Sequence, residues 1–89
     1  MRLDYFLKCT GLIPRRTMAK AACDEGLVEI NGKVSKASAE VSVGDVIKTR
    51  TGLVINEYEV LQLATRPVAR ALREDYVRLI STLKVDVDW

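Results

Sequence analysis

The chain has 89 residues and a net charge of only +2, with 48% hydrophobic and 29% charged residues. This composition is typical of a folded domain rather than a disordered segment. The length predicts a single domain, residues 1–89, with a thin core and little room for a deep catalytic cleft. No apolar run approaches the roughly 20 residues of a membrane span, and the early charges argue against a secretory signal. We therefore expect a cytoplasmic protein without a membrane partner.

Apolar spacing predicts two helices at the start of the chain. The first covers about residues 3–10 and ends at Gly11. Pro14 suits the opening of a second helix because its fixed φ is already helical. Gly26 suits the end of that helix. Met18 is among the side chains expected to face the core.

Strands follow the two helices. Asn31-Gly32 predicts a tight hairpin turn, since both positions tolerate positive φ. In the last predicted strand the apolar parity changes near Asn56-Glu57, which predicts a bulge or a break there. The predicted strands are residues 27–30, a restart at Val34, residues 46–50, and a run within residues 53–63.

The end of the chain is predicted to be helical. A helix over about residues 68–81 follows from the helical spacing of Ala69, Leu72, Tyr76, Leu79 and Ile80. Residues 84–89 are expected to form an unpacked tail. The fold class is therefore α+β, with two N-terminal helices packed on a small, mostly antiparallel sheet, plus a C-terminal helix.

The two cysteines are too few for a disulfide scaffold. Cys9 and Cys23 both fall in predicted helices. A free cysteine there behaves as a small apolar residue. We expect both thiols to be reduced and packed.

Basic residues gather near the N-terminus although the net charge is small. Residues 1–36 hold seven Arg and Lys against four acids, whereas residues 37–89 hold seven against eight. An asymmetry of this kind indicates a polyanionic partner.

The second predicted helix carries most of these cations. Arg16 and Lys20 share one helical face. Arg15 and Arg16 lie at the helix N-terminus, where free N–H groups and the helix dipole favour phosphate, and the Thr17 hydroxyl is a further donor. Guanidinium groups match phosphate oxygens in bidentate fashion, and lysine acts as a point charge.

The hairpin and the chain start extend this surface. Lys33 and Asn31 lie at the turn, Lys36 lies just beyond it, and Arg2 begins the first helix. Taken singly, any of these cations is more often a solvated surface charge. Asn31 has an alternative role in turn geometry alone. Asp4 is expected to serve the helix dipole or to orient a nearby arginine. The predicted RNA-binding set is Arg2, Arg15, Arg16, Thr17, Lys20, Asn31, Lys33 and Lys36.

Catalytic chemistry is not indicated. Histidine is absent, so Ser-His and Cys-His machinery is excluded. The adjacent acid pairs Asp24-Glu25 and Glu74-Asp75 do not converge on a helix surface. We expect no enzyme activity, cofactor, metal or small-molecule substrate. The aromatic residues are scattered, which favours recognition of RNA shape and backbone over base stacking.

Four motifs occur in order over about residues 1–50, and together they resemble the S4 RNA-binding domain family. They are Arg2-Leu3-Asp4-Tyr5-Phe6-Leu7, Arg16-Thr17-Met18-Ala19-Lys20, Gly26-Leu27-Val28-Glu29-Ile30-Asn31-Gly32 and Gly44-Asp45. One position departs from the family pattern, because Arg15 stands where a small polar residue is usual. This removes a side-chain N-cap and adds a cation.

The resemblance implies RNA recognition by the two helices and the hairpin. Within the family, the chain is most similar to stand-alone bacterial members of ribosome quality control. That similarity implies binding to 23S rRNA and tRNA on an obstructed 50S subunit. It also implies support of C-terminal tailing of the stalled chain, with a nascent-chain tailing factor as a further partner. Two alternatives stay open: a heat-shock-type factor that binds large subunits, and a protein-interaction module that docks through its C-terminal helix.

Overall fold

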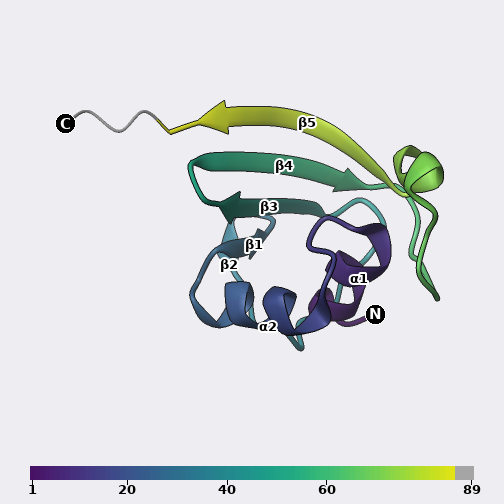
Figure 1. The fold of residues 1–89 in the computed structure, drawn as a ribbon, viewed down its shortest axis with the longest axis horizontal. Coiled ribbons are helices and arrows are strands. Elements are labelled where there is room, and N and C mark those ends of the chain that lie inside the picture. The colour runs from purple at the N-terminus through teal and green to yellow at the C-terminus, as the bar shows by residue number, and fades with distance from the viewer. Residues whose placement is uncertain (86–89) are drawn as a thin grey trace.

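The computed structural model describes residues 1–85, in which two α-helices precede an antiparallel sheet (Figure 1). The elements are α1 (Leu3–Thr10), α2 (Arg16–Asp24), β1 (Val28–Ile30), β2 (Lys33–Val34), β3 (Val46–Thr51), β4 (Val54–Val60), a 3-10 helix η1 (Arg70–Asp75) and β5 (Val77–Lys84). The strands pair in the order β2-β1-β3-β4-β5, and every pairing is antiparallel. The predicted α+β class and antiparallel sheet are confirmed.

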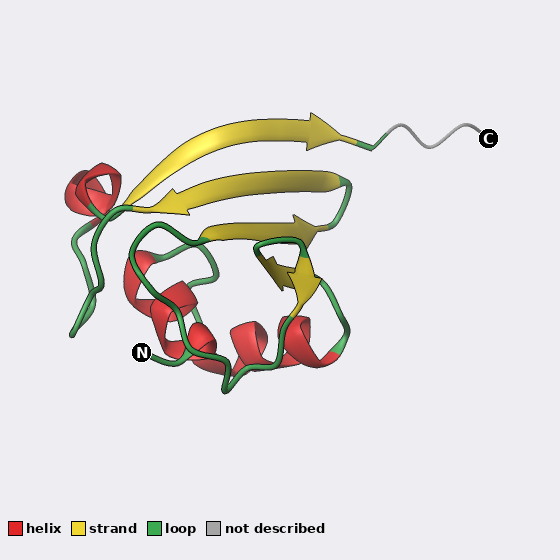
Figure 2. Cartoon of the chain, turned by 180° about the vertical axis from the view of Figure 1, so that it is seen from behind, coloured by secondary structure: helices red, strands yellow, loops and turns green. Residues whose placement is uncertain are grey.

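The helices and the sheet form two layers. Helices α1 and α2 lie on the side of β1 and β3, while β4 and β5 carry the sheet away from them (Figures 1 and 2). The core between the layers joins both helices to the strands and to the segment before β3. Its buried apolar residues are Leu3, Phe6, Leu7, Ile13, Ala19, Cys23, Val28, Ala37, Val41, Ile47, Val60 and Val77. Among the residues that the structure describes, no helix is long and apolar enough to cross a membrane.

Helix α1 has the predicted bounds. Its apolar stripe is fully buried, and Gly11 ends it with φ of 75°, a value that glycine adopts without a steric penalty. Its first N–H groups have partners outside the helix. Leu3 N donates to Ala39 O at 2.8 Å and Asp4 N donates to Ala37 O at 3.1 Å. The segment before β3 therefore holds the start of α1 in place.

Helix α2 starts later than predicted and turns a different face to the core. Pro14 lies in the bend before the helix, which begins at Arg16 with Arg15 as an N-cap that makes no side-chain hydrogen bond. Ala19 and Cys23 are buried, but Met18 is 55% exposed. The expectation for Met18 was therefore wrong. Small residues four apart let α2 approach α1 closely, and Met18 lies about 100° around the helix from Ala19.

The hairpin turn is confirmed. Asn31 and Gly32 both have positive φ, 52° and 83°, between β1 and β2. The predicted irregularity near Glu57 is also present, in the pairing of β4 with β5. Glu57 pairs with Ser81 and Tyr58 pairs with Leu79, so Ile80 is the extra residue of the bulge.

The prediction of a C-terminal helix over residues 68–81 was wrong for most of that range. Only Arg70–Asp75 is helical, as a 3-10 helix, and Val77–Lys84 is an edge strand paired with β4. The helix was predicted from apolar residues that were expected to face the core. Three of them, Leu72, Leu79 and Ile80, are exposed instead. Of the predicted tail, Lys84 pairs with Val54, and residues 86–89 lie outside the described part of the chain.

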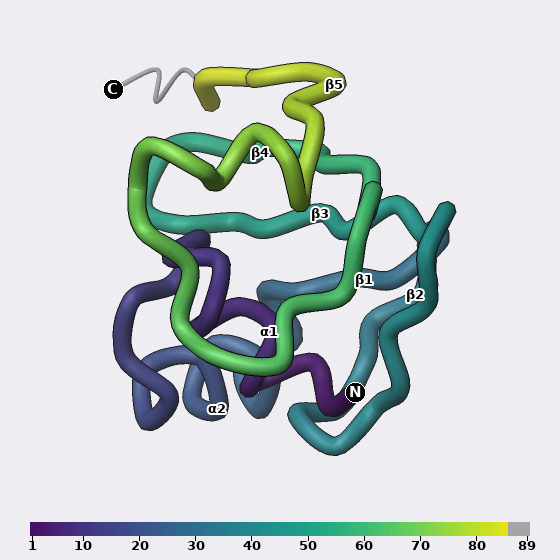
Figure 3. The backbone as a smooth tube through the Cα atoms, turned by 90° about the vertical axis from the view of Figure 1, so that its right-hand side faces the viewer, coloured from purple at the N-terminus to yellow at the C-terminus, as the bar shows by residue number. Residues whose placement is uncertain are grey.

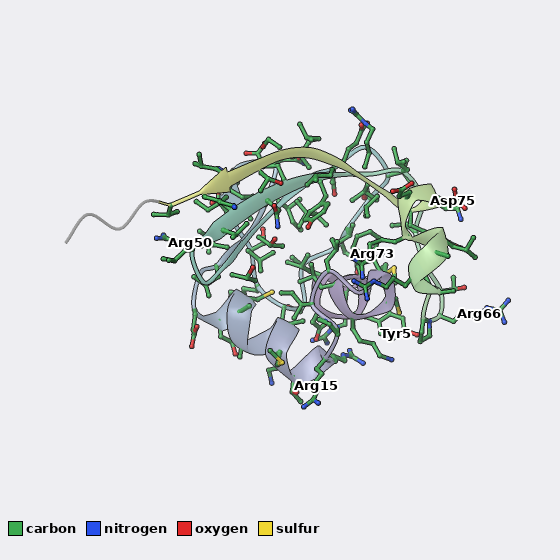
Figure 4. The ribbon with its side chains drawn as sticks, turned by 45° about the horizontal axis from the view of Figure 1, so that its top comes forward. Tyr5, Arg15, Arg50, Arg66, Arg73 and Asp75 are labelled. Carbon is green, nitrogen blue, oxygen red and sulfur yellow. The ribbon has the colours of Figure 1, made fainter. Side chains whose placement is uncertain are left out.

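The segment between β4 and β5 packs back on α1. Val68 N donates to Cys9 O at 2.8 Å, and Arg73 Nη2 donates to Gly11 O at 3.2 Å. Arg73 points from this segment toward α1 (Figure 4), where its charge meets the negative end of the helix dipole. Figure 3 shows the segment descending beside α1. This packing brings residues 63–65 next to the first turn of α1.

Candidate nucleic-acid interface

The centre of the interface is a buried carboxylate that holds two arginines. Asp4 in α1 accepts hydrogen bonds from Arg2 Nε at 3.2 Å, from Arg2 Nη2 at 3.3 Å and from Arg16 Nε at 3.3 Å. The Asp4 side chain is only 3% exposed, whereas those of Arg2 and Arg16 are about half exposed. Each arginine is thus anchored on one edge and open to solvent on another.

Asp4 is charged over the whole neutral range. Its burial acts to raise the pKa of the carboxyl group, but hydrogen bonds from Arg2, Arg16 and the Tyr5 N–H outweigh burial and hold that pKa below its ordinary value. One negative charge therefore neutralises one of two arginines, and the group retains a net positive charge. The predicted role of Asp4 in orienting an arginine is confirmed.

The ring of Tyr5 contacts Arg16, the second of these arginines. The Arg16 guanidinium carbon lies 5.4 Å from the centre of the Tyr5 ring, and Lys8 Nζ lies 5.7 Å from it, both within the range of a cation–π contact. The Tyr5 hydroxyl in turn donates to Thr65 O at 3.2 Å. Arg16 is therefore fixed by a carboxylate and by an aromatic ring.

Shallow grooves connect these arginines to the other predicted cations. Arg2, Arg16, Thr17 and Lys20 line one groove with Asp4, and Arg2, Lys20 and Lys36 line part of a neighbouring one. Arg2 and Lys20 line both, so the grooves adjoin. We call Arg2, Arg16, Thr17, Lys20 and Lys36 the basic face. It unites five of the eight side chains predicted from the sequence.

The other three predicted residues do not line these grooves. Arg15 is exposed at the start of α2 and points outward (Figure 4). Lys33 is exposed in β2. Asn31 uses its amide within the protein, since Nδ2 donates to Asp45 Oδ1 at 3.0 Å and Oδ1 accepts from Val46 N at 2.9 Å. Asn31 therefore ties the hairpin turn to the start of β3.

Tyr5 is the member of the interface that the sequence did not reveal. Its contact with Arg16 joins two helices, and its hydrogen bond to Thr65 spans 60 residues. Spacing along one helix carries no signal of either contact. Within residues 1–85, no cluster of three or more Cys, Asp and Glu side chains could hold a metal ion.

The fold and the basic face define a small α+β domain in which one carboxylate holds two arginines beside the exposed Lys20 and Lys36. The model of the S4 domain family matches residues 1–47, about half of the chain. Two proteins named RQC P-site tRNA stabilizing factor are similar to this chain. The one from Helicobacter pylori is 45% identical over 73% of this chain and 77% of its own length, and the one from Bacillus subtilis is 46% identical over 71% and 73%. The chain therefore belongs to the S4 domain family.

Solved structures agree with this fold. Heat shock protein 15 of Vibrio cholerae, determined as a trimer, superposes with a TM-score of 0.85 over 91% of this chain and 82% of its own, at 22% identity. The protein HP1423 superposes with a TM-score of 0.78 over 91% and 98%, at 39% identity. The first of these likenesses concerns the fold alone, since its sequence identity is low.

Proposed function

We propose that this protein is a non-catalytic RNA-binding factor of the large ribosomal subunit. It would bind 23S rRNA and peptidyl-tRNA on obstructed 50S subunits in the cytoplasm and support C-terminal tailing of the stalled chain. The observation that carries the proposal is the pair Arg2 and Arg16, fixed by buried Asp4 next to Lys20 and Lys36. The relatives named RQC P-site tRNA stabilizing factor favour tRNA as a ligand.

Phosphate is the chemical group that fits the basic face best. The terminal nitrogens of Arg16 have no hydrogen-bond partner among the described residues, because Asp4 engages only Nε. They match phosphate oxygens in geometry and charge. An arginine that is already oriented loses less side-chain entropy on binding than a free one. The basic face is thus suited to a folded RNA backbone.

The first experiment is co-sedimentation of the double variant Arg16→Ala/Lys20→Ala with 50S subunits. We expect weaker binding and a salt slope of log K reduced by about two, since each cation that meets a phosphate contributes about one. The matched control is Arg50→Ala/Lys84→Ala, which removes the same two residue types from exposed positions in β3 and β5. Unchanged 50S binding by the folded Arg16/Lys20 variant would refute the role of the basic face.

The tailing role needs a second experiment in cells. We expect deletion of the gene to abolish C-terminal tails on stalled chains, and the wild-type gene but not the Arg16→Ala/Lys20→Ala gene to restore them. Normal tailing in the deletion strain would favour a heat-shock-type function on the same subunit. Association with ribosomal proteins or another partner that survives complete digestion of the RNA would instead favour a protein-interaction module.

A further inference from the structure

A pocket of about 470 Å³ lies beside the basic face. Its walls come from Met1 and Arg2, from Tyr5 in α1, from Arg16 in α2 and from residues 63–65. The pocket is broadly open to solvent, and its volume falls within the range of small-ligand sites in proteins. The pocket exists because the segment after β4 packs back on α1, so that the Tyr5 hydroxyl meets Thr65 O.

The lining is mostly apolar surface, and two arginines contribute to it. Leu63 and Ala64 supply apolar surface, and the Tyr5 ring supplies an aromatic one. Met1, Thr65 and the side chains of Arg2 and Arg16 complete the lining, which includes no acidic side chain. A ligand that suits this pocket is flat, largely apolar on its faces and attached to negative charge.

We propose that the pocket receives one unpaired nucleobase of the RNA whose phosphates lie on the basic face. Unpaired bases in RNA stack on aromatic rings and on arginine side chains, and Tyr5, Arg2 and Arg16 line this pocket. The neighbouring phosphates would meet Arg2, Arg16 and Lys20, which line the adjoining groove. The inference rests on the proposed RNA-binding function and adds to it a preference for RNA with an extruded base.

The pocket is held in shape before any ligand arrives. Arg16 contacts Asp4 through Nε and lies over the Tyr5 ring, and Tyr5 is tied to Thr65 through its hydroxyl. A preformed site of this kind loses little conformational entropy on binding. Arg16 therefore takes part in both halves of the interface, as a phosphate ligand and as a wall of the base pocket.

The test compares two RNA hairpins that have the same charge. One carries a single bulged 2-aminopurine, and the other carries an abasic nucleotide at that position. We expect wild-type protein to bind the first about tenfold more tightly, the magnitude of one stacked base, and to change the 2-aminopurine fluorescence. Equal affinity for the two hairpins would refute binding of a base in the pocket. An apolar side chain of a protein partner would then be the better candidate for its occupant.

A pair of variants locates the effect in the pocket. Leu63→Asn makes the wall polar without altering charge, and we expect it to abolish the tenfold preference while the salt slope stays unchanged. Leu53→Asn is the matched control at an exposed leucine in the turn between β3 and β4, and it should keep the preference. An unchanged preference in folded Leu63→Asn would also overturn the proposal.

The two proposals fail in different ways. If neither hairpin binds with a salt-dependent affinity, the proposed RNA-binding function fails. If both bind with equal affinity and a normal salt slope, the RNA-binding function stands and the base pocket fails.

Discussion

Arg16 of α2 donates its Nε–H to the carboxylate of Asp4 in α1, across 3.3 Å and 12 residues of sequence. The same carboxylate accepts two hydrogen bonds from Arg2. The carboxylate of Asp4 therefore links the two helices and orients the two arginines at once. Stability and the proposed recognition of RNA are coupled at Asp4.

Asp4→Asn should lower both properties. The amide keeps the size of the side chain but leaves two arginines without their anion, and we expect the free energy of unfolding to fall by roughly 2–3 kcal/mol. Urea unfolding measures this change, and RNA affinity should fall in the same variant. Glu40→Gln is the matched control, because Glu40 is 75% exposed in its ion pair with the N-terminus and should change stability by less than about 1 kcal/mol. Equal unfolding curves for the two variants would contradict the role given to Asp4.

The contribution of Asp4 should depend on pH in a defined direction. Its pKa is lower in the folded protein than in the unfolded chain, so the unfolded state takes up a proton first as the pH falls. The stabilisation is fully present above the ordinary pKa of an aspartate and is lost as the pH falls through the depressed folded value. The difference in unfolding free energy between wild type and Asp4→Asn should therefore be constant near neutral pH and shrink in acid. A difference that grows toward acid pH would have the wrong sign.

Local pattern was sufficient for part of this molecule. Leu3, Phe6 and Leu7 with Gly11 predicted α1, because a helix face and its terminating glycine are adjacent in sequence. The i to i+4 spacing likewise placed Arg16 and Lys20 in one groove. The contacts that organise the interface, from Asp4 and Tyr5 to Arg16, depend on how α1 packs on α2. No spacing within one helix encodes them.

The C-terminal strand β5 could not be predicted from the local sequence pattern. Tyr76, Leu79 and Ile80 fit helical spacing, but spacing alone does not say whether an apolar side chain is buried. Val77 is the only residue of β5 that is buried, at 4% exposure, and Leu79 is 54% exposed. The bulge at Ile80 also breaks the alternation by which a strand is recognised.

Alanine substitutions in β5 test this assignment directly. Val77→Ala should cost about 2 kcal/mol, because it removes two buried methyl groups from the core. Leu79→Ala should change stability by less than about 0.5 kcal/mol, as is usual for an exposed position. A helix over residues 68–81 would have required the reverse order. Thermal or urea unfolding of the two variants decides between them.

Cys23 should be almost unreactive in the folded protein. Burial raises the pKa of its thiol to about 11, and the residue is 4% exposed. Since the thiolate is the reactive form, alkylation by iodoacetamide at pH 8 should be about 100-fold slower than for an ordinary cysteine. Peptide mapping by mass spectrometry measures this rate, and denaturation in urea should restore the ordinary one. Rapid modification of Cys23 without denaturant would contradict its packing between the helices and the sheet.

The contact of Arg73 with the end of α1 is testable by a double-mutant cycle. A Cβ atom at Gly11 would lie 2.7 Å from Arg73 Nη2, and Gly11 has φ of +75°. Gly11→Ala should therefore cost the roughly 1–2 kcal/mol of a left-handed alanine and, in addition, displace Arg73 from Gly11 O. Gly52→Ala is the control for the backbone effect alone, because Gly52 has φ of +59° and no atom within 4 Å of an added Cβ.

In the Arg73→Ala background, Gly11→Ala should cost no more free energy of unfolding than Gly52→Ala. The effects of Gly11→Ala and Arg73→Ala are therefore expected to be less than additive. Strict additivity of Gly11→Ala and Arg73→Ala would show that the segment before β5 is not held on α1 by this contact.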